Sequence, residues 1–276
     1  MPTALVSISW LKRNISSTGL ILLDASMNKV VGKTPLVYDS PTYLPNSQKL
    51  SLETDFCDLE SSLTHTLPTT DQFLNTCSKL GISDDNTVVI YDNQGIYSAP
   101  RAWWTFKIMG FDKVFVLDGG LPQWLDEGNP VVTELTSRPK SQTLQLEPQQ
   151  GKFCDSKFVF SKIKDKNAST FDARSYDRFT GQKPEPRAGV RSGHIPGSIS
   201  LPFSKVLNGY KLKSTEELKK TFAPFINSKH IFSCGSGITA CILILAAHEA
   251  GIKELCLYDG SWSDWGSNES LPIELE

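Results

Sequence analysis

Residues 230–250 read HIFSCGSGITACILILAAHEA. The apolar run 230–233 predicts a short buried strand, the glycines after it predict a turn, and the apolar run 240–250 predicts a helix that Gly251 terminates. A similar helix is predicted at residues 99–109. Strands that alternate with helices in this way are typical of α/β proteins, in which a mostly parallel sheet carries helices on its faces.

The pattern around this segment occurs twice, which indicates a tandem duplication. Three landmarks recur in the same order at offsets of 148, 142 and 141 residues: 23–25 (LDA) at 171–173 (FDA), 88–96 (VVIYDNQGI) at 230–238 (HIFSCGSGI), and 118–119 (DG) at 259–260 (DG). We therefore predict a first domain at residues 1–135 and a second at residues 157–276. Residues 133–156 lack apolar periodicity and are expected to form an extended linker.

The composition excludes several classes of function. Lys and Arg number 28 against 30 Asp and Glu, so bulk charge gives no reason to expect binding to nucleic acid or to an anionic membrane. No apolar run approaches the roughly 20 residues of a membrane span. The six cysteines form no CxxC pair and have no zinc-ligand spacing with the four histidines, so we expect free thiols and no metal.

Cys234 stands at the predicted turn between strand and helix. Two glycines let several backbone N–H groups face one point there, and the helix N-terminus adds its positive end. Such a setting lowers a thiol pKa from about 8.5 into the range of roughly 3.5 to 7.5. We therefore expect Cys234 to be a nucleophilic thiolate whose persulfide the same donors would hold. Cys77, Cys241 and Cys256 lie in apolar runs and are expected to be small buried side chains.

Two other interpretations of this turn are weaker. Gly235, Gly237 and Ala240 fit the dinucleotide-binding pattern G-x-G-x-x-A, but they lie too near the C-terminus for a complete nucleotide-binding half to follow. A cysteine phosphatase needs an arginine at the far end of the loop, where this chain has Ala240.

The first copy has Asp92 where the second has Cys234. A carboxylate cannot carry sulfur, so the first domain is expected to be a degenerate copy. It would then shape one wall of a single site between the two domains.

Seven segments spread along nearly the whole chain resemble the tandem-rhodanese family, in its 3-mercaptopyruvate sulfurtransferase branch. They are 23–25 (LDA), 97–101 (YSAPR), 118–121 (DGGL), 172–174 (DAR), 184–187 (PEPR), 193–197 (GHIPG) and 258–262 (YDGSW). The resemblance implies two tandem rhodanese-like domains, of which the second is catalytic, and a reaction without a cofactor. Members that prefer thiosulfate resemble C-R-K-G-x-x in the loop, and members that prefer mercaptopyruvate resemble C-G-S-G-x-T, as here.

The resemblance also implies roles for single residues. It implies that Cys234 and Ser236 are catalytic. It implies that the persulfide is held by the rest of the loop, which is Gly235, Gly237, Ile238 and Thr239. Arg178 and Arg187 would bind the carboxylate of mercaptopyruvate. A guanidinium suits that last role because it grips a carboxylate with two parallel hydrogen bonds. His194 could be a ligand or a base, but its GHIPG setting is a turn that leads into a strand, which favours a structural role.

One departure from the family pattern concerns proton transfer. Many members repeat H-I-P-G in the first domain and use that histidine with the loop serine, whereas residues 43–47 here read YLPNS. We therefore expect Ser236 to lack its usual partner and turnover of mercaptopyruvate to be slow. The yeast relatives that supply sulfur for tRNA thiolation resemble this chain in having P-N-S here, which favours a protein thiol as acceptor.

The implied function is transfer of sulfur from 3-mercaptopyruvate, or more weakly from thiosulfate, through a Cys234 persulfide to a thiol such as thioredoxin or a sulfur-carrier protein. The alternative is a relay protein without turnover, which takes sulfur from a cysteine desulfurase for tRNA thiolation. The expected location is the cytosol, the mitochondrion or both. Lys12 and Arg13, with no acid before Asp24, give a faint pattern of a mitochondrial leader, but residues 20–24 are already predicted to be a core strand, which favours a chain segment without a leader role.

Overall fold

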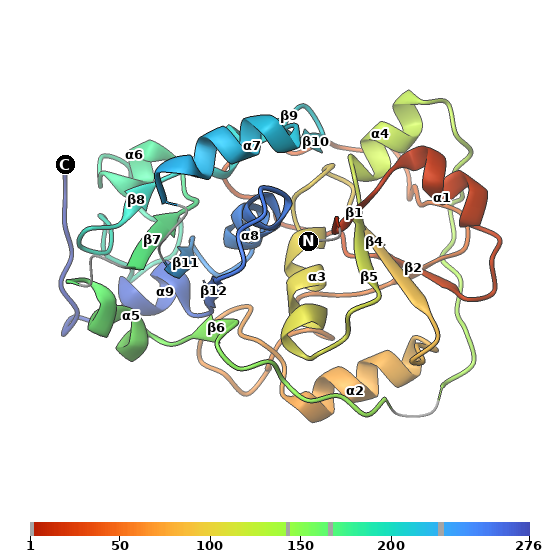
Figure 1. Ribbon diagram of the computed structural model, residues 1–276, viewed down its shortest axis with the longest axis horizontal. Helices are drawn as coiled ribbons and strands as arrows, with labels where there is room; N and C mark the ends of the chain where they lie inside the picture. The colour runs from red at the N-terminus through yellow and green to blue at the C-terminus, as the bar shows by residue number, and fades with distance from the viewer. Residues whose placement is uncertain (1–2, 142–143, 165–167, 226–228) are drawn as a thin grey trace.

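The computed structural model describes residues 3–141, 144–164, 168–225 and 229–276, and these contain two five-stranded sheets (Figure 1). The first sheet has the order β1-β5-β4-β2-β3, and all of its neighbouring strands run parallel. Its strands are β1 (Leu5–Val6), β2 (Leu20–Asp24), β3 (Ser47–Lys49), β4 (Thr87–Tyr91) and β5 (Val114–Leu117).

The second sheet repeats the first. Its order is β6-β12-β11-β7-β8, again parallel throughout, so each strand has a counterpart at the same place in the first sheet. Its strands are β6 (Phe153–Cys154), β7 (Ala168–Asp172), β8 (Ile199–Ser200), β11 (Lys229–Ser233) and β12 (Leu255–Tyr258). The predicted α/β class and the predicted duplication are both confirmed. A separate antiparallel pair consists of β9 (Leu207–Asn208) and β10 (Lys211–Leu212).

Helices flank both sheets. They are α1 (Ile8–Asn14), α2 (Thr70–Lys79), α3 (Ala99–Ile108), α4 (Gly120–Asp126), α5 (Ser156–Lys162), α6 (Tyr176–Phe179), α7 (Thr215–Phe222), α8 (Ala240–Glu249) and α9 (Ser261–Trp265), with 3-10 turns at Phe203–Val206 and Ala223–Phe225. The two helices predicted at 99–109 and 240–250 therefore exist, each one residue shorter at its C-terminal end. Gly251 has a φ of +93° and follows the last turn of α8, as expected of a helix-terminating glycine.

Helices α3 and α8 join the two halves. They pack against each other in the middle of the molecule (Figure 1), and a single apolar core contains residues of both sheets, such as Ile21 and Phe232. Helix α8 is apolar on all sides, and residues 240–247 are all buried, because its own sheet covers one face and α3 another. The site at the start of α8 therefore rests on a helix that both domains hold.

The linker predicted at residues 133–156 runs along the first domain. It contains no helix before α5 in its described part, and it ends in β6, the edge strand of the second sheet; residues 142 and 143 lie outside the described residues. The amide of Thr136 donates to the carbonyl of Ser47 at 2.8 Å, and that of Gln149 to the carbonyl of Ile108 at 2.6 Å. Composition thus predicted the lack of helix but neither β6 nor the contacts that hold the segment in place.

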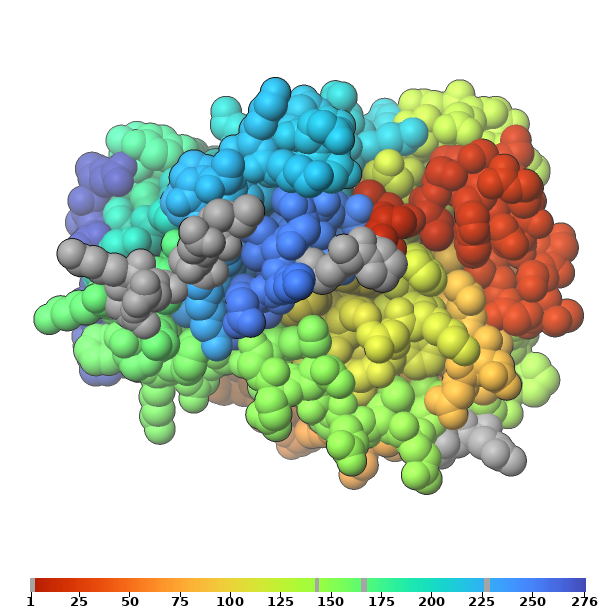
Figure 2. Space-filling view, in the orientation of Figure 1, coloured from red at the N-terminus to blue at the C-terminus, as the bar shows by residue number. Residues whose placement is uncertain are grey.

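The N-terminal residues also cross to the second half. The amide of Ala4 and the hydroxyl of Thr3 donate to the carboxylate of Glu249, at the end of α8, at 2.7 and 2.8 Å. Figure 2 shows the dark red N-terminal segment beside the blue surface of the second half. None of the described helices is both long and apolar enough to cross a membrane.

Candidate active site

Cys234 follows β11, the central strand of the second sheet, at the edge where ligands bind in parallel α/β sheets. Its amide donates to the hydroxyl of Ser261 at 3.1 Å, and its carbonyl accepts from the amide of Trp262 at 2.9 Å. The carbonyl of Gly235 accepts from the amide of Ser263, also at 2.9 Å. The start of α9 therefore fixes the backbone on which the thiol is mounted.

The loop after Cys234 presents a row of hydrogen-bond donors. Within the part of the chain that the structure describes, the amides of residues 235–240 have no protein acceptor. Gly237 has a φ of +79°, which only glycine adopts without strain, and it lets the loop curl back toward the thiol. Successive backbone N–H groups in such a turn, at the N-terminus of α8, form an anion-binding nest.

The first domain contains the same nest with a ligand of its own. One carboxylate oxygen of Asp92 accepts from the amide of Gln94 at 2.9 Å, and the other accepts from the amides of Tyr97, Ser98 and Ala99 at 2.8 to 2.9 Å. Asp92 is completely buried, and burial raises the pKa of its carboxyl group while the four amide bonds oppose that shift. The carboxylate of Asp92, the residue at which the loop begins, is thus bound by the backbone amides of that same loop.

Both domains line one cavity of about 290 Å³. The first domain contributes residues including Met27, Glu53, His65 and Tyr97, and the second contributes all the predicted site residues except Gly237, namely Cys234, Gly235, Ser236, Ile238, Thr239, Arg178 and Arg187. Gly237 belongs to the same loop but does not line the cavity. It packs against Arg101, since a Cβ on Gly237 would lie 2.8 Å from a buried guanidinium nitrogen of that residue. The expectation that the first domain supplies one wall of a shared site is confirmed.

The two predicted carboxylate-binding arginines differ in what they contact. Arg178 is bound by Glu185 through two parallel hydrogen bonds, from Nε at 3.0 Å and from Nη2 at 2.6 Å. Arg187 is half-buried, and among the described residues its one hydrogen bond is a long one of 3.4 Å to the carbonyl of Gly235. Of these two arginines, Arg187 therefore has more donors free for a substrate carboxylate.

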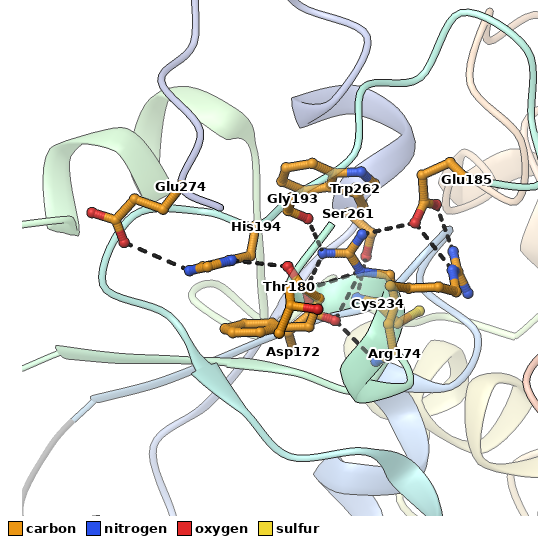
Figure 3. A network of polar contacts seen from close by, with 12 residues as sticks. Asp172, Arg174, Thr180, Glu185, Gly193, His194, Cys234, Ser261, Trp262 and Glu274 are labelled. Carbon is orange, nitrogen blue, oxygen red and sulfur yellow. Dashed lines mark hydrogen bonds and ion pairs between the residues drawn. The ribbon is translucent and has the colours of Figure 1, made fainter. Parts of the chain in front are cut away.

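A buried ionic network supports this side of the cavity (Figure 3). Arg174 lies between Asp172 and Glu185, with nitrogen–oxygen distances of 2.6 and 2.9 Å, and its guanidinium stacks 4.3 Å from the ring of Trp262. Glu185 in turn orients Arg178. Since Trp262 also bonds the backbone of Cys234, the arginines and the thiol share one rigid frame.

The expectation that Ser236 lacks a histidine partner is wrong. The Nδ1 atom of His65 lies 3.0 Å from the hydroxyl oxygen of Ser236. Burial, and then the charges of Arg101 and Arg187, lower the pKa of His65 to about 4, so its ring is neutral at pH 7. The segment 43–47, where a histidine was sought, instead pairs with Val132 and enters β3 at the far edge of the first sheet.

The remaining histidine and cysteine predictions agree with the structure. His194 is buried, lies 2.9 Å from the carbonyl of Phe179 through Nδ1 and stacks on the ring of Phe179. Cys77, Cys241 and Cys256 are buried in apolar clusters, and all six cysteines are free thiols. In the described ranges no group of three or more His, Cys, Asp or Glu side chains could hold a metal ion.

Comparison with known proteins identifies the family. The model of the rhodanese-like domain matches residues 7–127 and 159–268. The mitochondrial thiosulfate/3-mercaptopyruvate sulfurtransferase 1 of Arabidopsis thaliana is 37% identical over 98% of this chain and 77% of its own length, and the mouse 3-mercaptopyruvate sulfurtransferase is 37% identical over 95% and 91%. The crystal structure of Tum1 from Saccharomyces cerevisiae superposes with a TM-score of 0.85 at 28% identity, covering 99% of both chains.

Proposed function

Because this chain belongs to the rhodanese family and is a thiosulfate/3-mercaptopyruvate sulfurtransferase, we propose that Cys234 is the residue that carries the sulfur, as a persulfide. One observation carries the proposal. The amides after Cys234 have no protein acceptor among the described residues, whereas the matching amides of the first domain surround the anionic oxygens of Asp92. A persulfide anion on Cys234 would take the place that the carboxylate takes in the duplicate. We also propose residues 1–135 and 157–276 as the two domains.

The transfer has two steps. The Cys234 thiolate attacks the sulfur of 3-mercaptopyruvate, a sulfur–sulfur bond forms, and the carbon–sulfur bond breaks to leave the enolate of pyruvate, which takes up a proton. A thiolate acceptor then attacks the outer sulfur, which leaves as the acceptor's persulfide and restores the Cys234 thiolate. His65, which is neutral at pH 7, contacts the hydroxyl of Ser236, and we propose that this pair moves the proton.

The mass of the intact chain tests the assignment directly. Brief incubation with 3-mercaptopyruvate should add one sulfur atom to the wild-type chain, and treatment with a small thiol should remove it. The same treatment of Cys234→Ser should add none. Sulfur that still appears on the serine variant would place the carrier at another cysteine.

Arg187 should bind the carboxylate of the donor. A charge-assisted hydrogen bond contributes roughly 1.5 to 3 kcal/mol, so Arg187→Ala should lower kcat/KM for mercaptopyruvate by about one to two powers of ten. Arg187→Lys should restore part of the loss, because an ammonium retains the charge but not the two-pronged geometry. Steady-state kinetics with both variants measure this.

Loading from a donor without a small free carboxylate provides the control. The persulfide of a cysteine desulfurase should load Arg187→Ala nearly as well as the wild type. Equal losses with both donors would mean that Arg187 supports the loop through its contact with Gly235, and Arg178 would then become the candidate for the carboxylate.

The neutral loop should favour mercaptopyruvate over thiosulfate. Thiosulfate carries two charges, and Gly235 and Ser236 offer no cation to the second. We expect the double variant Gly235→Arg, Ser236→Lys to shift the ratio of the two kcat/KM values toward thiosulfate. A side chain at position 235 would be tightly packed, since its Cβ would lie 3.2 Å from Nη2 of Arg178, and that nitrogen would have to shift by a few tenths of an ångström.

The matched control for loop charge is Gly235→Ala with Ser236→Ala. It removes the same hydroxyl and adds a side chain at the same place, but it adds no charge. If the charged and neutral double variants have the same donor ratio, charge in the loop does not select the donor.

The physiological acceptor is proposed to be a thiol, such as thioredoxin or a sulfur-carrier protein, in the cytosol or the mitochondrion. The alternative of a relay without turnover rested in part on a missing histidine, and His65 removes that support. What continues to favour the relay is the P-N-S sequence at 45–47, which resembles the yeast relatives. Release of pyruvate in many cycles per chain, measured with excess mercaptopyruvate and a small thiol, would decide for the enzyme.

A further inference from the structure

His65 is held in an uncommon backbone conformation. Its φ is +63°, in the left-handed region that non-glycine residues adopt only where the surrounding structure imposes it. Its ring bonds Ser236, which lies 171 positions further along the chain and in the other domain. The contact between the His65 ring and the Ser236 hydroxyl therefore depends on tertiary structure, and a small change in the backbone of His65 would break it.

One ion pair grips this turn at two points. The Nη2 atom of Arg101 donates to the carbonyl of His65 at 2.6 Å and to one carboxylate oxygen of Asp259 at 2.8 Å. The other oxygen of Asp259 accepts from the amide of Leu67, also at 2.8 Å. Arg101 thus holds the carbonyl of His65, and its ion-pair partner Asp259 holds the amide of Leu67.

The pair is largely buried, with the side chain of Arg101 1% exposed and that of Asp259 14% exposed, and it crosses the domain boundary. Arg101 lies on α3 of the first domain, and Asp259 follows β12 of the second domain. Another nitrogen of Arg101, Nη1, has no hydrogen-bond partner in the described structure and would lie 2.8 Å from a Cβ at Gly237 of the loop that follows Cys234. Neither side chain lines the cavity, so neither touches the donor.

A buried ion pair contributes little to stability compared with apolar residues of the same size, and it does specify geometry in some proteins. Here the turn that carries His65 and the loop that carries Ser236 share this one support. We propose that Arg101 and Asp259 are positioning residues, which hold the His65 ring against Ser236 when the two domains are packed together. The inference rests on the proposed role of His65 in the transfer.

A double-mutant cycle between Asp259 and His65 tests it. Asp259→Asn should lower kcat for transfer from mercaptopyruvate by about tenfold to a hundredfold, since misplacement of a catalytic group by about 1 Å can cost a factor of that size. KM should change little, because Arg187 is untouched. In the His65→Ala background Asp259→Asn should cause no further loss. The matched control is Asp264→Asn, which removes a carboxylate that bonds Tyr258 and should leave kcat unchanged.

The other outcomes contradict the inference. Losses that multiply in the double variant, or a higher KM with the same kcat, would show that the pair acts through something other than His65. If His65→Ala alone leaves kcat intact, the proposed role of His65 fails, and the positioning role fails with it. Thermal unfolding of each variant reports the fold. If Asp259→Asn does not fold, Arg101→Lys takes its place under the same criteria, because a lysine retains the charge but cannot hold both partners in the guanidinium geometry.

Discussion

Cys234→Ser should lower sulfur transfer from 3-mercaptopyruvate by roughly four to six powers of ten, the range expected when a covalent nucleophile is removed. The hydroxyl is a far poorer nucleophile toward sulfur and cannot form a persulfide. The thermal midpoint should stay close to that of the wild type, because Ser is nearly isosteric and the backbone of residue 234 keeps its bonds to Ser261 and Trp262. Pyruvate release and thermal unfolding, measured side by side, test both halves of the expectation.

Cys154→Ser is the matched control, since Cys154 lies on the edge strand β6 and outside the cavity. That variant should transfer sulfur at the wild-type rate. Alkylation at pH 6, mapped by peptide mass, adds an independent measure: Cys234 should react first, and Cys57 much more slowly because burial raises the pKa of its thiol. Equal labelling of Cys234 and Cys57 would contradict an activated nucleophile.

His65→Ala should lower kcat by about two to four powers of ten, the usual contribution of a positioned acid or base. Burial and two arginines lower the pKa of His65 to about 4, so the ring is neutral throughout the physiological range. The ratio of wild-type to variant kcat should therefore be constant at neutral and alkaline pH. It should fall toward one only as the pH approaches 4, where the wild-type ring becomes protonated.

Ser236→Ala should show a similar loss, and the double variant should lose little more, because the two side chains act as one unit. A pH profile that changes near 6.5, the ordinary value for histidine, would show that His65 is solvated during the reaction. No effect of either substitution would leave proton transfer to another group that lines the cavity, such as Glu53.

The fold could be predicted because its signals are local. About ten residues are enough to encode each of these signals: a short apolar strand, the glycine turn after Cys234, and the glycine that ends α8. Because the chain is duplicated, the pattern of strand and turn occurs twice. The turn at residues 234–239, whose amides have no acceptor in the described structure, was predictable for the same reason. Helix α8 was also found, but its apolar sequence on every side gave no sign that α3 of the other domain would cover it.

The part of the site that could not be predicted comes from contacts between distant segments. His65 lies in a stretch without helix or strand, and its partner Ser236 lies 171 positions away, so no spacing indicated the pair. The H-I-P-G pattern of the family points to residues 43–47 instead. The composition did contain a signal for His65. The chain has four histidines, and the sequence pattern already assigned His194 to a turn and His230 to a strand, which left few candidates for a partner of Ser236. The bidentate grip of Glu185 on Arg178 is likewise a product of packing.

The carboxylate of Asp92 has a consequence for how the two copies have diverged. In the first copy, the carboxylate at position 92 is bound by four backbone amides as part of the fold, so a substitution there should act on stability. In the second, position 234 is the proposed sulfur carrier, which would gain and lose sulfur in every cycle, so a substitution there should act on activity. On this proposal the first copy, with its carboxylate held by the loop amides, has the arrangement that the second copy would have when loaded with sulfur.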